Sequence, residues 1–299
     1  MFIKTRDKSI AEKLIVAALT TSAIIFGFML IAILLFMLQE SWAVWSEISV
    51  WSFLSGTDWR PVAAVPQLGI AAMIASTLWV AGGSLLIAAP LGFGSAVFLA
   101  EFAPFWLAAV LRPVLNILTG IPSVVYGFLG AAVLVRYFES SFDLATGESL
   151  FAASLVLAIM ILPYIISNSE SSLRSVPLEY RHAGLALGVS RPYMVWRILL
   201  PLAGKGMLGA LVLALGRALG ETMAVLMLAG NILLFPSSWF SQGEPLPALI
   251  ALELGSATPG TLHYQGLFAA GFVLLLIVIA INILIHALQH KLKNEVSRF

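Results

Sequence analysis

The chain contains no cysteine and unusually little charge. Of its 299 residues only 10% are Asp, Glu, Lys or Arg, whereas 60% are hydrophobic and the mean hydropathy is +1.00. The missing cysteine excludes a disulfide framework, a thiolate zinc site and an iron–sulfur cluster. A soluble domain carries about 25% charged residues. The composition therefore excludes soluble globular and disordered chains, and predicts an all-α membrane protein that crosses the bilayer several times.

Motifs for nucleotides, metals and nucleic acids are also missing. There is no G-x-x-x-x-G-K-[ST] phosphate loop, because Gly204-Lys205-Gly206 has the wrong spacing, and there is no H-E-x-x-H. No metal-ligand spacing relates the four histidines, which are His182, His263, His286 and His290. Nor does any basic patch alternate with aromatic residues, as nucleic acid binding requires. We expect no cofactor, no metal and no nucleic acid on this chain, so energy from a nucleotide must enter through another chain.

Six apolar stretches approach the length of about 20 residues that a membrane-spanning helix needs. They are Leu14–Leu38, Leu68–Leu99, Pro113–Val135, Leu150–Ile166, Gly206–Leu228 and Gly266–Leu288. We interpret the first as an uncleaved anchor. The second is long enough to be tilted or broken, and a break is expected at Pro90. The stretches Gln39–Gln67 and Phe235–Gln265 are then external loops, the second of them mostly irregular.

Basic residues fall almost entirely on one side of these spans. Thirteen occupy the N-terminus, alternate loops and the tail: Lys4, Arg6, Lys8, Lys13, Arg112, Arg174, Arg181, Arg191, Arg197, Lys205, Lys291, Lys293 and Arg298. The opposite loops hold only Arg60 and Arg136. This asymmetry predicts that both termini are cytoplasmic. We divide the chain into an anchor helix with its external loop (1–65), a membrane domain (66–290) and a cytoplasmic tail (291–299).

Two charged residues, Arg217 and Glu221, lie inside the fifth apolar stretch. They are the only charged residues from Met207 to Leu234, although a charge at the centre of a spanning helix costs roughly 2.5–3.5 kcal/mol or more. Four positions apart, they can pair on one helix face. One interpretation is a salt bridge that only fixes packing. The other is that Arg217 supplies a cation in the path of an anion, while Glu221 positions it and weakens its grip.

Three further polar residues are weaker candidates for the same pathway. Ser123 and Tyr126 lie in a span that Pro122 should break, where backbone groups are freed. Asn231 lies near the outer end of the fifth stretch. Ordinary helix packing is the alternative interpretation for each.

The loop between the fourth and fifth stretches, at about 168–200, is too patterned to be a simple linker. Pro177 opens a helical segment, Gly188 ends it, and Arg191-Pro192 starts a second. Apolar residues alternate with charged ones in both. The loop therefore predicts two short amphipathic helices, which either rest on anionic lipid or dock on a cytoplasmic partner.

This arrangement resembles the permease subunits of type I ATP-binding-cassette importers. Their coupling loop begins E-A-A, with a glycine six residues after the glutamate and a proline thirteen residues further on; Gly188 and Pro201 have that spacing. His182-Ala183-Gly184 stands in place of E-A-A, with Glu179 one helical turn earlier. The resemblance implies the type I permease fold with six transmembrane helices, and a coupling loop that contacts an ATPase.

Within that class the sequence is most similar to phosphate permeases of the PstC type. The similarity rests on GRALGETMAVLMLAGN at 216–231, GIPSVVYGFLG at 120–130 and ILPYI at 161–165. It implies a phosphate importer in a bacterial or archaeal cytoplasmic membrane. The implied partners are a PstA-type permease, two cytoplasmic ATPase subunits, an external phosphate-binding protein and membrane lipid.

The main alternative is a permease for sulfate, molybdate or tungstate, whose R-x-x-G-E is typically followed by F-G, where this chain has Thr222-Met223-Ala224. A stand-alone channel or secondary transporter should place ionisable residues in several spans, and here one span holds them. An intramembrane enzyme would need a catalytic constellation in the spans, and the sequence offers none. We therefore expect no catalytic residue on this chain.

Overall fold

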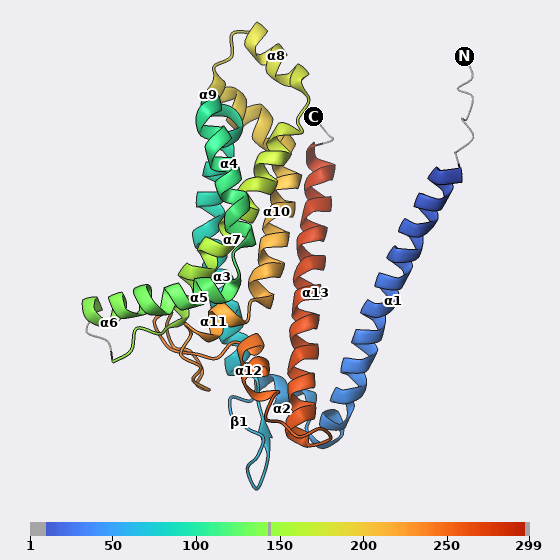
Figure 1. Ribbon diagram of the computed structural model, residues 1–299, viewed down its shortest axis with the longest axis vertical. Helices are drawn as coiled ribbons and strands as arrows, with labels where there is room; N and C mark the ends of the chain where they lie inside the picture. Colours follow the sequence, from blue (N-terminus) through green and yellow to red (C-terminus); the bar gives the residue numbers. More distant parts are fainter. Residues whose placement is uncertain (1–9, 143–144, 297–299) are drawn as a thin grey trace.

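A computed structural model describes residues 10–142 and 145–296. Long helices form a bundle (Figure 1). They are α1 (Ile10–Glu47), α3 (Ala71–Val97), α4 (Phe105–Gly120), α7 (Leu150–Arg174), α10 (Leu200–Gly220) and α13 (Leu262–Val296). Short helices are α2 (Val50–Ser55), α5 (Ser123–Leu129), α6 (Arg136–Phe142), α8 (Leu178–Ala186), α9 (Arg191–Met194), α11 (Met223–Leu226) and α12 (Leu246–Glu253). Three π-helical turns, η1 (Phe98–Phe102), η2 (Gly130–Val135) and η3 (Val195–Leu199), adjoin them, and β1 (Trp59–Arg60) pairs antiparallel with β2 (Gln67–Leu68).

Helix α7 is the centre of the bundle. It begins after Ser149, whose hydroxyl accepts a hydrogen bond from the backbone N–H of Ala152 at 3.1 Å. Its sides pack against α3, α10 and α4. In its most apolar 18-residue stretch, 67% of the residues are buried. Its fully buried Leu157, Ile161 and Ile165 lie in the largest apolar core. The position of α7 determines where residues on the neighbouring helices can meet.

The two ends of the bundle differ in charge. We call them the α8 end and the β1 end after the elements that they carry (Figure 1). Helix α1 begins and α13 finishes at the α8 end (Figure 1), where the basic residues of α7, α8 and α9 also lie. The described termini therefore share one end with the basic loop, as the charge asymmetry requires. Lys4, Arg6, Lys8 and Arg298 lie outside the described residues.

Helix α1 stands apart from the rest. None of the residues in its most apolar 18-residue stretch is buried, and it contacts α13 only near the β1 end (Figure 1). Such a fully apolar, uncovered helix suits a lipid environment or a neighbouring subunit. The predicted anchor at Leu14–Leu38 is confirmed as helix and is longer than predicted, running to Glu47.

The third predicted span is not one straight helix. Helices α4 and α5 meet at a 94° bend over Ile121 and Pro122, so the predicted break at Pro122 is confirmed. The segment α5–η2–α6 then leaves the bundle sideways (Figure 1). Among the described residues, five helices are long and apolar enough to span a membrane, or six if this bent pair counts as one span. A side chain on Gly127 would collide with the backbone of Ala224, so glycine lets α5 lie directly on α11.

Two other predictions of span boundaries need correction. Helix α3 continues through Pro90 without a break, and its irregular turn, η1, comes later. The fifth span begins earlier and ends earlier than Gly206–Leu228, because helix runs continuously from Arg191 to Gly220. Gly220 ends the helix because the next residue turns to an extended conformation, with φ −72° and ψ 124°.

The predicted external loop, Phe235–Gln265, is mostly irregular as expected, but it contains the short helix α12 and is packed into the molecule. The side chains of Leu246 and Leu249 are fully buried. The backbone N–H of Leu246 donates to the buried Thr77 hydroxyl at 2.9 Å. The sequence analysis did not predict α12 within this loop. Prolines here start α12 and do not prevent folding, since proline fits the first turn of a helix.

Candidate functional site

Arg217 lies in the last turn of α10, against the central helix. Its guanidinium carbon is 4.8 Å from the centroid of the Tyr164 ring on α7. The two are therefore in cation–π contact. The Nε atom of Arg217 is buried and makes no hydrogen bond within the described chain. Buried donors are nearly always paired in native proteins. Arg217 thus has a free donor and its full charge available for a ligand or for another subunit.

The predicted pairing of Arg217 with Glu221 is wrong. The four-residue spacing brings two side chains together only inside a helix, and α10 ends at Gly220. Glu221 instead turns toward α11, where its Oε1 accepts a long contact of 3.5 Å from the backbone N–H of Ala224. Every salt bridge found in the described residues involves other side chains. Arg217 is therefore not neutralised by its predicted partner.

Tyr126 joins the same region from the other side of the bend. Its hydroxyl donates to the backbone carbonyl of Leu118 at 3.0 Å and ties α5 back to α4. The side chain is within electrostatic reach of Arg217 and Tyr164. Ser123 is half-buried one helical turn earlier on α5. The structure thus brings one of the two predicted residues of this span to Arg217 and places the other beside it on the same helix.

Asn231 holds a turn after α11. Its φ of 48° is left-handed, a conformation that asparagine tolerates. Its amide nitrogen donates to the carbonyl of Leu226 at 2.8 Å, while its side-chain oxygen is buried without a partner among the described residues. The turn accounts for the nitrogen but leaves the oxygen free, so a pathway role for Asn231 stays a prediction.

The predicted coupling loop forms one short helix, α8, and the start of another. The N–H groups of Gly188 and Val189 donate to the carbonyls of Leu185 and Gly184, both at 3.0 Å, and Gly188 has a φ of 71°. This is the Schellman arrangement, which explains the glycine. The predicted second helix is not separate, because α9 continues through η3 into α10. Pro201 consequently lies in the first turn of α10.

Arg181 fixes α8 to the bundle. Its guanidinium donates to Glu101 at 2.6 Å and to the backbone carbonyls of Val176 and Leu173 at 2.8 and 2.9 Å. On the same helix Gly184 is buried against Met194, whose sulfur would lie 3.1 Å from an added Cβ. This close packing explains why a glycine can stand in the third position of His182-Ala183-Gly184.

The outer surface of α8 is free and largely apolar. Glu179, His182 and Ala183 are exposed. Leu178, Leu185 and Leu187 are exposed as well, with Leu187 at 81%. Apolar residues exposed together indicate a surface that another protein or a membrane covers.

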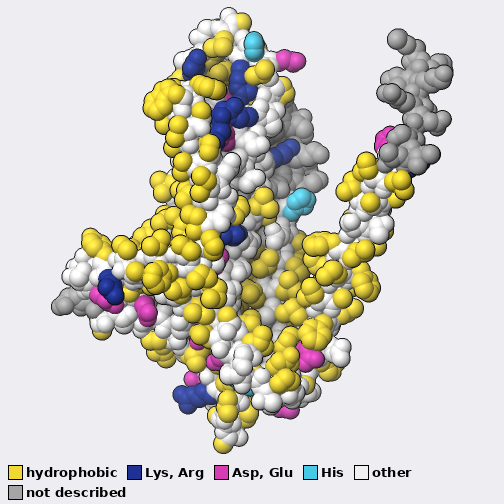
Figure 2. All heavy atoms as spheres, in the orientation of Figure 1, with side chains coloured by type: hydrophobic (Ala, Val, Ile, Leu, Met, Phe, Trp, Pro, Cys, Tyr) yellow, Lys and Arg dark blue, Asp and Glu magenta, His cyan; other side chains and the backbone are white. Residues whose placement is uncertain are grey.

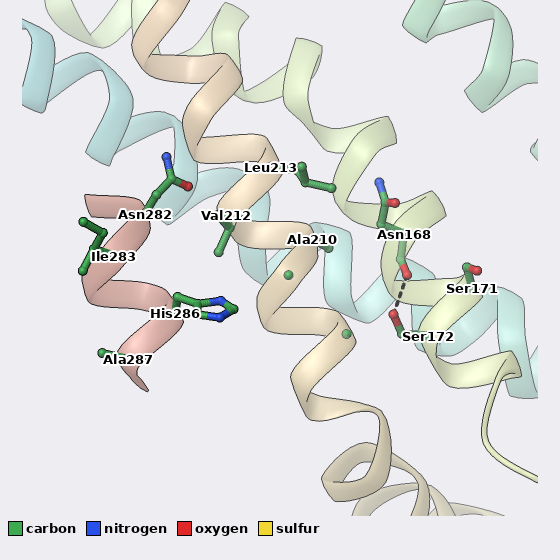
Figure 3. Close-up of a pocket in the computed structure, with 12 residues that line it drawn as sticks. Asn168, Ser171, Ser172, Ala210, Val212, Leu213, Asn282, Ile283, His286 and Ala287 are labelled. Atoms are coloured by element: carbon green, nitrogen blue, oxygen red, sulfur yellow. Dashed lines mark hydrogen bonds between the residues drawn. The ribbon is translucent and has the colours of Figure 1, made fainter. Parts of the chain in front are cut away.

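A cleft of about 880 Å³ lies between α7, α10 and α13 (Figure 3). Figure 3 shows His286 and Asn282 of α13 facing α10, with Asn168 and Ser172 on α7 at the far side. The lining residues that the structure describes include no lysine or arginine. The cleft therefore lacks the fixed positive charge that would mark it as a second candidate anion site.

A second charged group lies on α7 and α4, and the sequence reasoning missed it. Glu170 is only 6% exposed, and it pairs with both Arg112 and Arg174 at 2.8 Å. The fourth span was expected to end at Ile166, which placed Glu170 in a loop. The signal available was the spacing of Glu170 and Arg174, since Glu four residues before Arg is the favourable order on a helix.

A third charged group lies near the β1 end. Glu253 accepts a hydrogen bond from the Trp59 indole at 2.9 Å and contacts the ring of His263 at 2.7 Å. Glu244 is nearby and only 5% exposed. Burial raises the pKa of Glu244 to about 7, and the charge of Glu253 adds to this shift.

Comparison with known proteins agrees with this architecture. Residues 88–298 match the family described as binding-protein-dependent transport system inner membrane component. A probable ABC transporter permease protein of Bacillus subtilis, YqgH, is 39% identical over 82% of this chain and 80% of its own length. The phosphate transport system permease protein PstC of Pasteurella multocida is 33% identical over 92% of this chain and 90% of its own.

Solved structures share the fold at lower identity. A bacterial alginate ABC transporter in complex with its alginate-bound periplasmic protein matches over 94% of this chain and 96% of its own, with a TM-score of 0.67 and 16% identity. The inward-facing methionine transporter MetNI matches over 75% and 95%, with a TM-score of 0.59 and 18% identity. At these identities the likeness concerns the fold alone.

Proposed function

Because the chain belongs to the family of binding-protein-dependent inner-membrane transport components, and among them to the PstC-type permeases, we propose that it carries inorganic phosphate across the membrane. It is the permease subunit of an ABC importer with the type I fold. Phosphate arrives from an external binding protein and leaves into the cytoplasm of a bacterial or archaeal cell. The chain itself needs no cofactor in this proposal, since ATP is hydrolysed on separate subunits.

One observation carries the proposal. Arg217 is a permanent cation beside a bend in the bundle, held over Tyr164 and left without its predicted acidic partner. Guanidinium suits phosphate because it offers planar, paired donors and a charge that does not titrate. Removing that charge from water without a counter-ion is costly. In a permease that passes an anion, the anion itself is the transient partner of Arg217, which explains why the arginine has no permanent counter-ion.

The exposed surfaces of the bundle support the remaining partners. In this proposal the exposed apolar face of α8 docks on the ATPase, and the basic residues around it favour a cytoplasmic location for this end. A PstA-type permease covers the side of the bundle where α5, η2 and α6 project, because that segment exposes Phe128, Leu129 and Val133. Membrane lipid surrounds the rest, α1 included.

Uptake of labelled oxyanions tests the proposal. Cells that lack other phosphate importers should take up radioactive phosphate when they express this chain with its permease partner, ATPase and binding protein. A tenfold excess of sulfate, molybdate or tungstate should leave that uptake unchanged. Uptake of sulfate, molybdate or tungstate in place of phosphate would contradict the assignment and favour the other oxyanion permeases.

A further inference from the structure

The charged group around Glu170 has one more cation than it needs. Arg112 Nε and Arg174 Nε both donate to the same carboxylate oxygen, Oε1 of Glu170, at 2.9 and 2.8 Å. A buried carboxylate requires one cationic partner to avoid the cost of an unpaired charge. The second arginine adds a net positive charge. The neighbouring Arg181 does not change this balance, because it pairs with Glu101.

Spare donors at this place belong to Arg174. The Nη2 atom of Arg112 is buried and lies 2.8 Å from the carboxylate oxygen that Nε already uses, so the guanidinium of Arg112 is engaged with Glu170. Its neighbour Arg174 is half exposed, at 50%. Two converging guanidinium groups, one of them exposed, are the usual protein contribution to an oxyanion site.

A hollow adjoins the two arginines. Its volume is about 330 Å³, and it is lined by Arg112, Leu115, Asn116, Ser167, Glu170, Ser171 and Arg174. The amide and the two hydroxyls can donate to the oxygens of a tetrahedral anion. Figure 2 shows basic side chains gathered on one face of the molecule near the α8 end.

The hollow lies on the same face of α7 as the Arg217 site. Tyr164, Ser167, Ser171 and Arg174 are spaced by three, four and three residues and therefore share one side of the helix. The distance from Tyr164 to Arg174 along the axis is about 15 Å. On α4, Arg112, Asn116 and Thr119 form a matching row, and Leu111 and Leu115 pack near Leu162 of α7. Polar side chains therefore recur along α7 and α4 from the level of Tyr164, which contacts Arg217, to the two arginines.

We propose that Arg112 and Arg174 form a second oxyanion site at the α8 end, which takes phosphate after it leaves Arg217. This inference rests on the proposed function, from which it takes the identity of the anion and the direction of travel. The site binds through a net charge of one, so it holds phosphate weakly enough to release it. A phospholipid headgroup has the same chemistry, and the test must separate the two sources.

Equilibrium binding of radioactive inorganic phosphate to the complete importer provides the test. The importer is placed in phosphatidylcholine nanodiscs without binding protein or nucleotide, and the Arg217→Gln form is the background, so that the first site does not contribute. Adding Arg174→Gln should weaken phosphate binding about tenfold, the loss expected for a charge-assisted contact. The matched control is Arg191→Gln, which removes an exposed arginine at the same end and should leave binding unchanged.

The variant is chosen to remain folded. In Arg174→Gln the carboxylate of Glu170 keeps Arg112, so assembly and thermal stability should match the background, and both are measured. Phosphate binding that Arg174→Gln does not weaken, in an assembled importer whose wild-type form transports phosphate, overturns the second site and leaves the proposed function standing. Failure of phosphate uptake in the wild type would instead reject the proposed function.

Lipid composition separates the two sources. When phosphatidylglycerol replaces half of the lipid, the Arg174-dependent binding of free phosphate should persist. If the anionic headgroup abolishes it, the arginines hold lipid and the transit role is wrong.

Discussion

The guanidinium carbon of Arg217 lies 4.8 Å from the centroid of the Tyr164 ring, whereas Glu221, four residues further on, lies beyond the end of the helix. An aromatic face holds a cation without neutralising it, since the interaction is with the ring quadrupole. A carboxylate would hold it and cancel its charge. For a protein that passes an anion, the first arrangement keeps the arginine both positioned and attractive.

The aromatic contact predicts how substitutions of Tyr164 behave. Tyr164→Phe keeps the ring and should leave phosphate uptake within about twofold of the wild type. Tyr164→Leu removes the ring face, and the loss of about 1 kcal/mol of positioning should lower uptake several-fold at equal protein level. Initial rates of uptake, divided by the amount of protein in the membrane, measure both. Equal rates for the two variants would show that the ring does not position Arg217.

Neutralising Glu221 should leave the stability of the complex unchanged, whereas neutralising Glu170 should lower it. Glu221→Gln strands no buried partner, so permease abundance and assembly should be unchanged and stability should shift by less than about 0.5 kcal/mol. Glu170→Gln leaves Arg112 and Arg174 without their shared carboxylate and should cost about 2 kcal/mol or more. Quantitative blotting and thermal unfolding of the purified complex compare the two. A lower amount of protein for Glu221→Gln would indicate that Glu221 pairs with Arg217, as the sequence suggested.

The surface of α8 should lie against the ATPase. The chain has no cysteine, so a single one at the exposed Ala186 should crosslink to cysteines in the docking cleft of the ATPase. The control is a cysteine at Val62, which is 83% exposed at the opposite end and should not crosslink. Gel electrophoresis of the assembled complex gives the result. If Ala186 and its neighbours fail to crosslink in an intact complex, α8 rests on lipid instead.

Glu244 should make stability depend on pH. Its folded pKa of about 7 exceeds the ordinary value of 4.5 because of burial and, secondarily, Glu253. Above pH 4.5 the folded state therefore holds more protons than the unfolded state, and stability falls as pH rises through 7. Glu244→Gln abolishes this loss, so it should stabilise the complex at pH 8 by up to about 3 kcal/mol and have little effect at pH 4.5.

Thermal unfolding of the complex at pH 4.5 and pH 8 checks this, with the exposed Glu47→Gln as the control that should behave like the wild type at both. The same melting temperature for Glu244→Gln and the wild type at pH 8 would mean that Glu244 is not buried in the assembled importer.

Apolar length and basic asymmetry were enough to predict most of the helices. The spans, the shared end of α1 and α13, and the glycine stop at Gly188 depend on hydropathy and local backbone preferences, which the sequence states directly. The end of α10 at Gly220 could not be predicted in this way, because the apolar run resumes after Glu221 and Thr222 and continues to Leu228, so hydropathy does not mark the turn between α10 and α11. The error of the Arg217–Glu221 pair follows from that one misplaced boundary.

Long-range contacts explain what else the sequence did not disclose. The Arg217 side chain meets Tyr164, which is 53 positions earlier, and Glu170 meets Arg112, which is 58 positions away. Neither spacing has a periodic signature. The residue type was informative even though the contact partner was not predictable. An arginine in an apolar run indicated an anion, whichever side chain positions the arginine.

Phosphate uptake into proteoliposomes that contain the complete importer tests the central role of Arg217 most directly. Arg217→Gln should abolish uptake, and Arg217→Lys should retain only a small part of it, because an ammonium group lacks the paired donors of a guanidinium. Assembly and the stimulation of ATP hydrolysis by the binding protein should remain in both. Near-normal phosphate uptake by Arg217→Gln, at normal abundance, would contradict the account and show that the anion is recognised elsewhere.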